Sequence, residues 1–244
     1  MKNTLLMTAT INPSSDFLTI TDRDQRRKQY YESLFYWICH SNFDQIVFCE
    51  NSAASINQSF WHELAELYHK KLEFLIYQQM NDSNNASKGY LECKLIDYAL
   101  RNSDILQNKT QKFYKVTGRV RLKNVNHLLK IHQNDENVFI RSGISNRDSF
   151  DTRFFKMSCH MYQSKIMQHI NKINDKGGYY MEHLFYDVFN NKLSGESKTK
   201  YNKVTFKELP IIIGFSGSTG LSYDLSIYKR IIKSILLRLG VYNV

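Results

Sequence analysis

Residues 112–122 read KFYKVTGRVRL, in which polar and apolar side chains alternate until a glycine interrupts the pattern. The alternation predicts a half-buried strand. Its end at Thr117-Gly118-Arg119 places a hydroxyl, a bare backbone and a guanidinium at one edge of a sheet, where open α/β sheets bind ligands. Two interpretations stay open: Lys115 and Arg119 either face a phosphate or diphosphate, or belong to a solvated surface strand.

Three strand and helix pairs precede this strand. Apolar runs predict strands at 4–10, 45–49 and 72–77, and helical spacing predicts helices at 25–39, at 58–71 and from 88 onward. Such alternation is typical of a mostly parallel sheet with helices on both faces, in a Rossmann-like α/β fold. Because no linker or repeat interrupts the chain, we expect one domain over residues 1–244.

Small and polar residues follow the predicted strands. Those at the first two strand ends are Thr8, Ala9, Thr10 and Asn51. They either leave room for a flat ring or pack tightly. Lys88 and Gly89 open the third helix, where free amide groups and a cation predict an anion site.

The second half of the chain carries acidic and aromatic residues on shorter elements. Asp151 and Arg153 lie two apart on a predicted strand at 150–155 and share one face, so they hold either each other or a ligand. Glu182 opens a helix that runs to about residue 189. It is either a general base with a shifted pKa or an acid favoured by the helix dipole.

Further elements complete the second half. A helix is predicted at 159–173, and strands at 138–141 and 209–214. The loop at 190–202 is either a lid or a surface excursion. The loop after the last strand offers hydroxyls and bare amides that can wrap a phosphate, at Ser216, Gly217, Ser218 and Thr219.

The last predicted helix, at 225–239, is amphipathic. We expect its isoleucines to point inward and its basic residues to point outward. Two roles stay open for it: a packed layer with a solvated face, or a contact with an anionic membrane.

Composition limits which partners and which cellular location the sequence is compatible with. The 244 residues carry a formal charge of +10, so the partner is expected to be anionic. The four cysteines lack paired metal spacing, which predicts reduced thiols in a cytosolic protein without zinc. No apolar run is long enough for a signal peptide or a spanning helix. We therefore expect a cytoplasmic protein, in solution or at the inner face of the plasma membrane.

Seven short motifs, in their order along the chain, resemble bacterial glycosyltransferases of capsule and lipopolysaccharide assembly. They are TATINP at 8–13, ENS at 50–52, KGYLE at 88–92, KVTGR at 115–119, DTRFF at 151–155, YMEH at 180–183 and SGSTG at 216–220. The resemblance covers nearly the whole chain. It implies a GT-A-like fold in which residues 1–124 bind a nucleotide-sugar donor and residues 125–244 bind the acceptor.

The resemblance also implies roles for single residues. Ordinary members end the central strand in a metal-binding Asp-x-Asp, whereas this chain has Thr-Gly-Arg there and its Asp22-Arg23-Asp24 is better explained as a helix cap. No metal cofactor is therefore expected, although a divalent cation stays open. The donor side would comprise Thr8, Ala9, Thr10, Asn51, Lys88, Gly89, Lys115, Thr117, Gly118 and Arg119, with Lys88, Lys115 and Arg119 neutralising the diphosphate.

On the acceptor side, the resemblance implies that Glu182 is the general base, with Asp151 as the substitute. Arg153, His183 and the loop at 216–219 would contact the acceptor or a phosphate. The acceptor would be lipid-linked or an oligosaccharide.

Two other functions stay open. One is nucleic-acid binding, which the charge and the 14% aromatic content suit, although the basic residues are too scattered for us to expect it. The other is a non-catalytic peripheral-membrane partner of a polysaccharide assembly complex.

Overall fold

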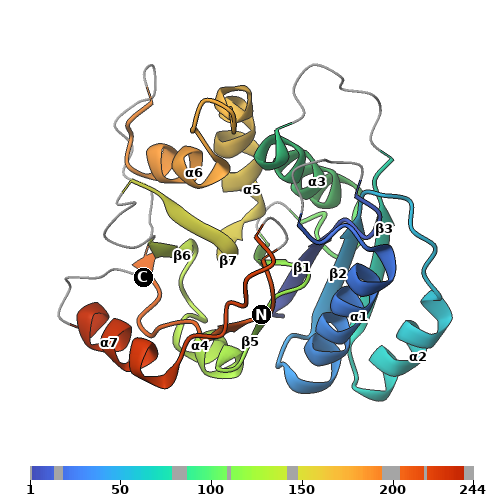
Figure 1. Ribbon diagram of the computed structural model, residues 1–244. Helices are drawn as coiled ribbons and strands as arrows, with labels where there is room; N and C mark the ends of the chain where they lie inside the picture. The colour runs from blue at the N-terminus through green and yellow to red at the C-terminus, as the bar shows by residue number, and fades with distance from the viewer. Residues whose placement is uncertain are drawn as a thin grey trace.

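A seven-stranded sheet forms the middle layer of the molecule (Figure 1). The computed structural model describes residues 2–13, 19–78, 87–108, 111–141, 148–193, 204–216 and 219–238. The strand order is β3-β2-β1-β4-β7-β6-β8. The bounds of these strands are β1 Thr4–Ala9, β2 Gln45–Glu50, β3 Lys71–Ile76, β4 Lys112–Thr117, β6 Val138–Arg141, β7 Phe150–Ser158 and β8 Val204–Thr205.

Within this sheet every strand except β7 runs in the same direction. β1 pairs in parallel with β2 and β4, and β2 pairs in parallel with β3. β7 is antiparallel to β4 and β6, and β8 is parallel to β6. The predicted α/β class with a mostly parallel sheet is therefore confirmed, and one sheet joins residues from both halves of the chain.

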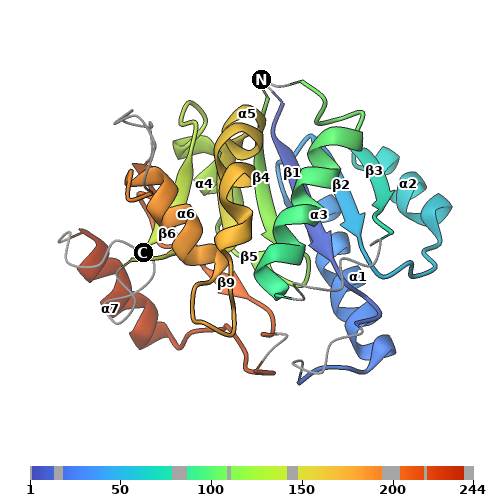
Figure 2. The same ribbon diagram turned by 90° about the horizontal axis from the view of Figure 1, so that it is seen from above.

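Helices cover both faces of the sheet (Figures 1 and 2). On one face, α1 (Arg23–His40), α2 (Gln58–Leu67) and α4 (Val125–Ile131) pack with Leu5 and Met7 of β1. On the other face, α3 (Lys88–Asn102), α5 (Cys159–Met161) and α6 (Met181–Phe189) pack with Leu6. Because successive residues of a strand point to opposite faces, β1 is buried on both sides and reads as an apolar run.

The predicted strand at 112–122 is shorter than expected and ends at Thr117. Gly118 turns the chain, and β5 (Arg121–Leu122) pairs with β9 (Ile212–Ile213) in a separate sheet. A Cβ on Gly118 would lie 2.5 Å from the Thr8 carbonyl oxygen and 2.9 Å from the Tyr30 ring. The glycine is therefore required because β1 and α1 approach the backbone closely.

Two further predicted elements differ from the structure. The helix expected at 159–173 is interrupted: α5 continues as a π-helix, η2 (Tyr162–Ile166), and then as a 3-10 helix, η3 (Met167–Lys172). The strand expected at 209–214 shrinks to the two residues of β9. There, the amide of Ile212 donates to the carbonyl oxygen of Pro210, so the backbone turns instead of extending the pairing.

The terminal helix, α7 (Ile227–Arg238), exposes the face that was predicted to be buried. Its isoleucines at 227, 231, 232 and 235 are each more than half exposed, whereas Leu237 packs against the main core. At about 100° per residue, Leu237 lies on the side of the helix opposite these isoleucines. The expected inward orientation is therefore wrong. Within the described residues, no helix is both long and apolar enough to cross a bilayer.

Candidate active site

Several predicted site residues meet where β1, β2 and β4 end. Thr8 of β1 lies beside Thr117 of β4 in the parallel register. The Thr10 hydroxyl donates to the Asn51 side-chain oxygen at 2.7 Å, and the Asn51 amide donates to the Ala9 carbonyl oxygen at 3.1 Å. The carboxyl ends of these parallel strands thus bring the predicted donor-side residues of β1 and β4 and the loop after β2 together.

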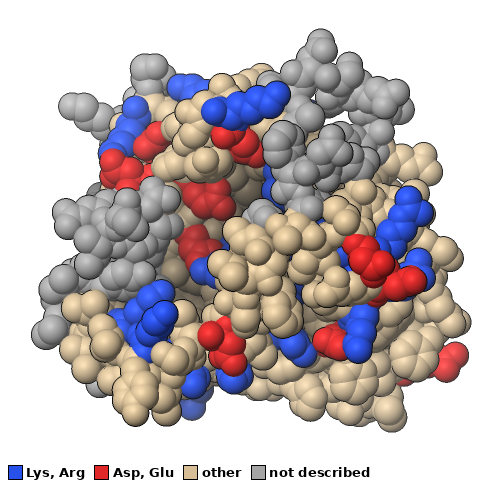
Figure 3. Space-filling view, in the orientation of Figure 1, with Lys and Arg blue, Asp and Glu red and all other residues tan. Residues whose placement is uncertain are grey.

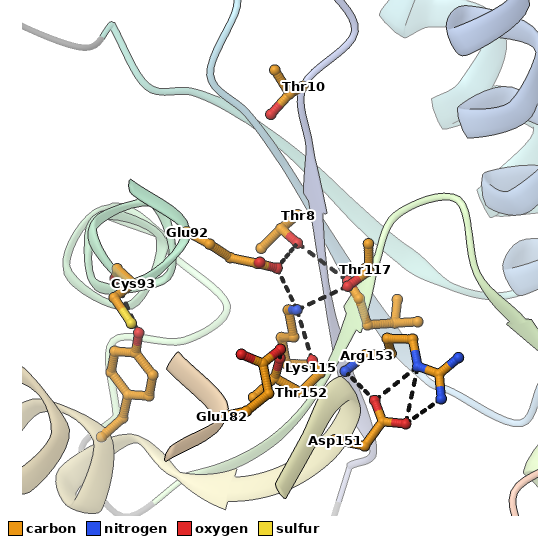
Figure 4. A network of polar contacts seen from close by, with 12 residues as sticks. Thr8, Thr10, Glu92, Cys93, Lys115, Thr117, Asp151, Thr152, Arg153 and Glu182 are labelled. Atoms are coloured by element: carbon orange, nitrogen blue, oxygen red, sulfur yellow. Dashed lines mark hydrogen bonds and ion pairs between the residues drawn. The ribbon is translucent and has the colours of Figure 1, made fainter. Parts of the chain in front are cut away.

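A group of charged side chains lies beside these strand ends (Figure 4). Lys115 is fully buried, and its ammonium group donates to Glu92 at 2.5 Å, to the Thr117 hydroxyl at 3.1 Å and to the Thr152 carbonyl oxygen at 2.9 Å. These three bonds use all three of its donors. Such a placement does not favour the predicted direct contact between Lys115 and a diphosphate. We call the carboxylate cluster the five residues Glu92, Lys115, Asp151, Arg153 and Glu182.

Glu92 was missed as a site residue by the sequence analysis. It lies on α3, where its carboxylate accepts hydrogen bonds from Lys115 and, at 3.2 Å, from Thr8. Burial alone would raise its pKa, but the charge and hydrogen bond of Lys115, the charge of Lys88 and the Thr8 hydrogen bond together outweigh burial, and the pKa is lowered. The sequence did contain a signal for Glu92. It follows Lys88 by four residues and precedes Leu95 by three, which places it on the same face of the helix as both.

Glu182 is held differently. It lies in the first turn of α6, and its carboxylate accepts a hydrogen bond of 2.8 Å from the Thr152 hydroxyl. Its pKa is raised, first by burial and further by the nearby negative charges of Glu92 and Asp151. In the part of the chain that the structure describes, no cation forms an ion pair with it. A carboxylate of this kind is suited to accept a proton.

Asp151 and Arg153 bind each other, which is one of the two interpretations that the sequence left open. The Arg153 Nε donates to both carboxylate oxygens of Asp151, at 2.8 and 3.0 Å. Burial would raise the pKa of Asp151, but Arg153 outweighs it and the pKa is lowered. The Arg153 guanidinium also lies 4.4 Å from the ring centroid of Tyr223, just before α7.

A second group, which we call the arginine pair, consists of Arg26 and Arg119. Both are buried, with exposed fractions of 3% and 7%, and both guanidiniums lie within 6 Å of the Tyr30 ring centroid, at 5.8 and 5.7 Å. Arg26 donates to the Thr10 carbonyl oxygen at 3.0 Å, and Arg119 donates to the Gln29 side chain at 3.0 Å. The sequence did not single out Arg26 among the four basic residues in the first two turns of α1, where opposition to the helix dipole leaves open a nearby anion or a solvated basic turn.

The arginine pair lacks negative partners. Among the described residues no carboxylate forms an ion pair with either arginine, and the buried Nε of Arg119 has no hydrogen-bond partner. Burial and the charge of Arg119 both lower the pKa of Arg26. Two buried positive charges with no counter-charge in the described part of the chain favour an anion beside the ends of β1 and β4.

The surface is hollowed near these strand ends. In the view of Figure 3, acidic side chains with a basic neighbour line a hollow below α6.

The predicted anion site at the start of α3 already has an acidic partner. The Gly89 amide donates to the Asp175 carboxylate at 3.2 Å, and a Cβ on Gly89 would lie 3.2 Å from the Cβ of Met181. Lys88 lies near Glu92 and helps to lower its pKa. The structure therefore assigns Gly89 to close packing and amide capping, which does not favour a bound phosphate there.

The remaining predicted residues have local partners. His183 accepts from the Tyr180 amide at 3.1 Å and so caps α6. The Ser216 hydroxyl accepts from the Thr219 amide at 3.2 Å, which closes this loop on itself. Gly217, Ser218 and most of the loop at 190–202 lie outside the described residues.

The described residues do not fit a divalent ion at the end of β4. Thr117-Gly118-Arg119 offers no carboxylate there, and the Asp22 side chain accepts from the Gln25 amide at 2.6 Å as the cap of α1. Among the described side chains, no three of His, Cys, Asp and Glu are grouped so as to hold a metal ion. We therefore assign no step to a metal.

Comparisons with known proteins give matches among solved structures only. No protein-family model matches the chain, and no curated protein matches it in sequence. A protein of Desulfovibrio desulfuricans G20, described as a nucleotide-diphospho-sugar transferase, is 7% identical with a TM-score of 0.49, over 84% of this chain and 80% of that one.

Two other solved structures have similar scores. The glycosyltransferase GlyE of Streptococcus pneumoniae TIGR4 is 8% identical with a TM-score of 0.49, over 84% of this chain, which spans only 45% of GlyE. The nucleoside-diphosphate-sugar pyrophosphorylase of Vibrio cholerae RC9 is 9% identical with a TM-score of 0.47, over 86% of this chain and 94% of that one.

Proposed function

We propose that this chain is a glycosyltransferase that moves a sugar from a nucleotide-sugar donor to a hydroxyl of a lipid-linked or oligosaccharide acceptor. The proposed setting is the synthesis of a bacterial surface polysaccharide, such as a capsule or a lipopolysaccharide, in the cytoplasm. One observation carries the proposal: at the same edge of one sheet lie Glu182, which forms no ion pair with a described cation, and two arginines, which form no ion pair with a described carboxylate. Transfer from a sugar diphosphate needs both kinds of group.

The arginine pair suits the donor. A nucleoside diphosphate leaving group gains negative charge as its bond to the sugar breaks, and fixed positive charges stabilise that charge. Arg26 and Arg119 are already buried and held by Thr10 and Gln29, so little side-chain freedom is lost on binding. We propose that they take the place of a divalent ion, so that no metal cofactor is required.

Glu182 suits the acceptor. In the proposed reaction its carboxylate takes the proton of the acceptor hydroxyl while that oxygen bonds to the anomeric carbon. The bond between this carbon and the diphosphate breaks, and its electron pair leaves with the diphosphate. A raised pKa makes Glu182 a better proton acceptor than an ordinary carboxylate. Asp151 is a weaker candidate because Arg153 lowers its pKa and occupies both of its oxygens.

The test uses nucleotide sugars directly. The purified chain is incubated with UDP-, GDP-, ADP- and dTDP-linked sugars, with and without simple glycoside acceptors, and release of the nucleoside diphosphate is followed by chromatography. We expect release from at least one donor. If no donor is turned over and no nucleoside diphosphate raises the melting temperature, the enzyme assignment is wrong and the non-catalytic alternative gains support.

A further inference from the structure

The terminal helix α7 carries an unpartnered apolar surface. The exposed fractions are 59% for Ile227, 76% for Tyr228, 52% for Ile231, 57% for Ile232 and 51% for Ile235. At about 100° per residue these five side chains form one continuous stripe along the helix. We call them the isoleucine stripe. Exposed apolar stripes of this size on one element mark surfaces that bind something.

A basic residue flanks the isoleucine stripe. Lys229 is exposed beside it, whereas Arg230 is half-buried and lies about 20° from Leu237, on the side of the helix that packs against the body. Figure 3 shows basic side chains over this part of the surface, at the lower left. Long cationic side chains beside an apolar face reach lipid phosphates while the apolar residues enter the boundary of the acyl chains. The formal charge of +10 adds attraction to an anionic surface.

The position of α7 links this surface to the candidate active site. Figure 2 shows α7 on the side of the molecule toward which the parallel strands point. Tyr223, four residues before α7 begins, packs against Arg153 of the carboxylate cluster. A surface bound by α7 would therefore lie on the side of the molecule that carries the strand ends.

We propose that α7 binds the surface of an anionic membrane, with the isoleucine stripe in the lipid interface and Lys229 on lipid phosphates. The charge of Lys229 and the formal charge of +10 favour this occupant over a second copy of the chain, because two copies stacked stripe to stripe would bring like charges together. This proposal does not depend on the proposed reaction, because it concerns binding without any nucleotide.

The test is sedimentation of the whole chain with vesicles of phosphatidylcholine, with and without phosphatidylglycerol. We expect binding to the anionic vesicles and its loss at high salt. The double variant Ile231→Glu/Ile235→Glu should weaken binding by at least about 10-fold, since each isoleucine adds about 1.5 kcal/mol or more when buried. Both positions are more than half exposed, so the variant should fold.

Two further variants distinguish binding through α7 from a general attraction of the basic chain to anionic vesicles. Lys229→Glu should also weaken binding, by a smaller factor, because about 1 kcal/mol is expected per basic residue near an anionic surface. Arg101→Glu, at the far end of α3, should leave binding unchanged. The proposal is overturned if the chain does not sediment with anionic vesicles, or if the isoleucine variant sediments as well as the native chain. It is also overturned if light scattering shows a dimer that the isoleucine variant abolishes while vesicle binding is absent.

Discussion

The carboxylate cluster and the arginine pair lie at the ends of the same strands, but their charges are balanced in opposite ways. In the cluster, Lys115 binds Glu92 and Arg153 binds Asp151, so each cation has its own carboxylate. In the arginine pair, neither guanidinium forms an ion pair with a carboxylate among the described residues. Within the part of the chain that the structure describes, the charges of the first group are balanced except at Glu182, and those of the second are not.

This difference indicates which groups are available for chemistry. Buried charges that pair with each other are held in place and are costly to separate. Among the described residues of the two groups, Glu182 and the arginine pair have no oppositely charged partner, and a negatively charged substrate with a proton to lose would complement both. The paired residues then serve as the support that orients them.

The largest expected effect is on stability. Lys115→Met should lower the free energy of unfolding by about 3 kcal/mol, because it leaves the Glu92 carboxylate, which is only 20% exposed, without its cation. Arg119→Met should change it by less than about 1 kcal/mol, since no carboxylate loses a partner. Chemical denaturation followed by circular dichroism measures both values.

A double variant provides the control for this comparison. Lys115→Met combined with Glu92→Gln should recover part of the loss, because the uncompensated charge is gone. Equal losses of stability for Lys115→Met and Arg119→Met would show that the charges of the carboxylate cluster and of the arginine pair are balanced in the same way. The difference between the two groups would then be refuted.

The next effect is on turnover. Glu182→Gln should lower kcat by about 10²- to 10⁴-fold, because the amide cannot take a proton, and should leave the affinity for a nucleoside diphosphate unchanged. Steady-state kinetics with the donor found in the survey of nucleotide sugars measures kcat, and calorimetry measures the affinity. Glu63→Gln, on the exposed side of α2, is the matched control. If Glu182→Gln retains its turnover, Glu182 is not the general base, and Asp151 becomes the candidate for that role.

The pH profile gives an independent readout of Glu182. Only its ionised form accepts a proton, so kcat should fall as the pH falls through its raised pKa, and the acid limb should lie above the ordinary value of 4.5. Since the folded pKa is raised, the stability contributed by protonated Glu182 is full below 4.5 and is lost as the pH rises through the folded pKa. Glu182→Gln should remove both effects.

Local pattern was enough to predict the first half of the fold. Strands expected at 45–49 and 72–77 lie at Gln45–Glu50 and Lys71–Ile76. They could be predicted because the pattern of apolar and polar residues that defines a buried strand or an amphipathic helix is local in the sequence. The pattern also indicated the sheet edge at Thr117 and singled out Glu182 and Arg119.

Long-range contacts explain what the sequence could not predict. Gly118 is required by Thr8 and Tyr30, and Lys115 is neutralised by Glu92, all of them distant in sequence. Periodicity located the apolar face of α7 but not the side of the helix that meets the body. The burial of Arg26 could not be predicted because the Thr10 carbonyl oxygen that it binds and the Arg119 charge beside it come from other elements.

The most direct test of the central claim is calorimetric titration of nucleoside diphosphates into the chain in the presence of EDTA. The arginine pair predicts that one of them binds without a divalent ion, and that Arg119→Met weakens this binding by about 10- to 100-fold, as expected for a lost charge-assisted contact. Arg101→Met should bind as the native chain does. Binding that requires an added divalent ion, or that is unchanged in Arg119→Met, would contradict the account.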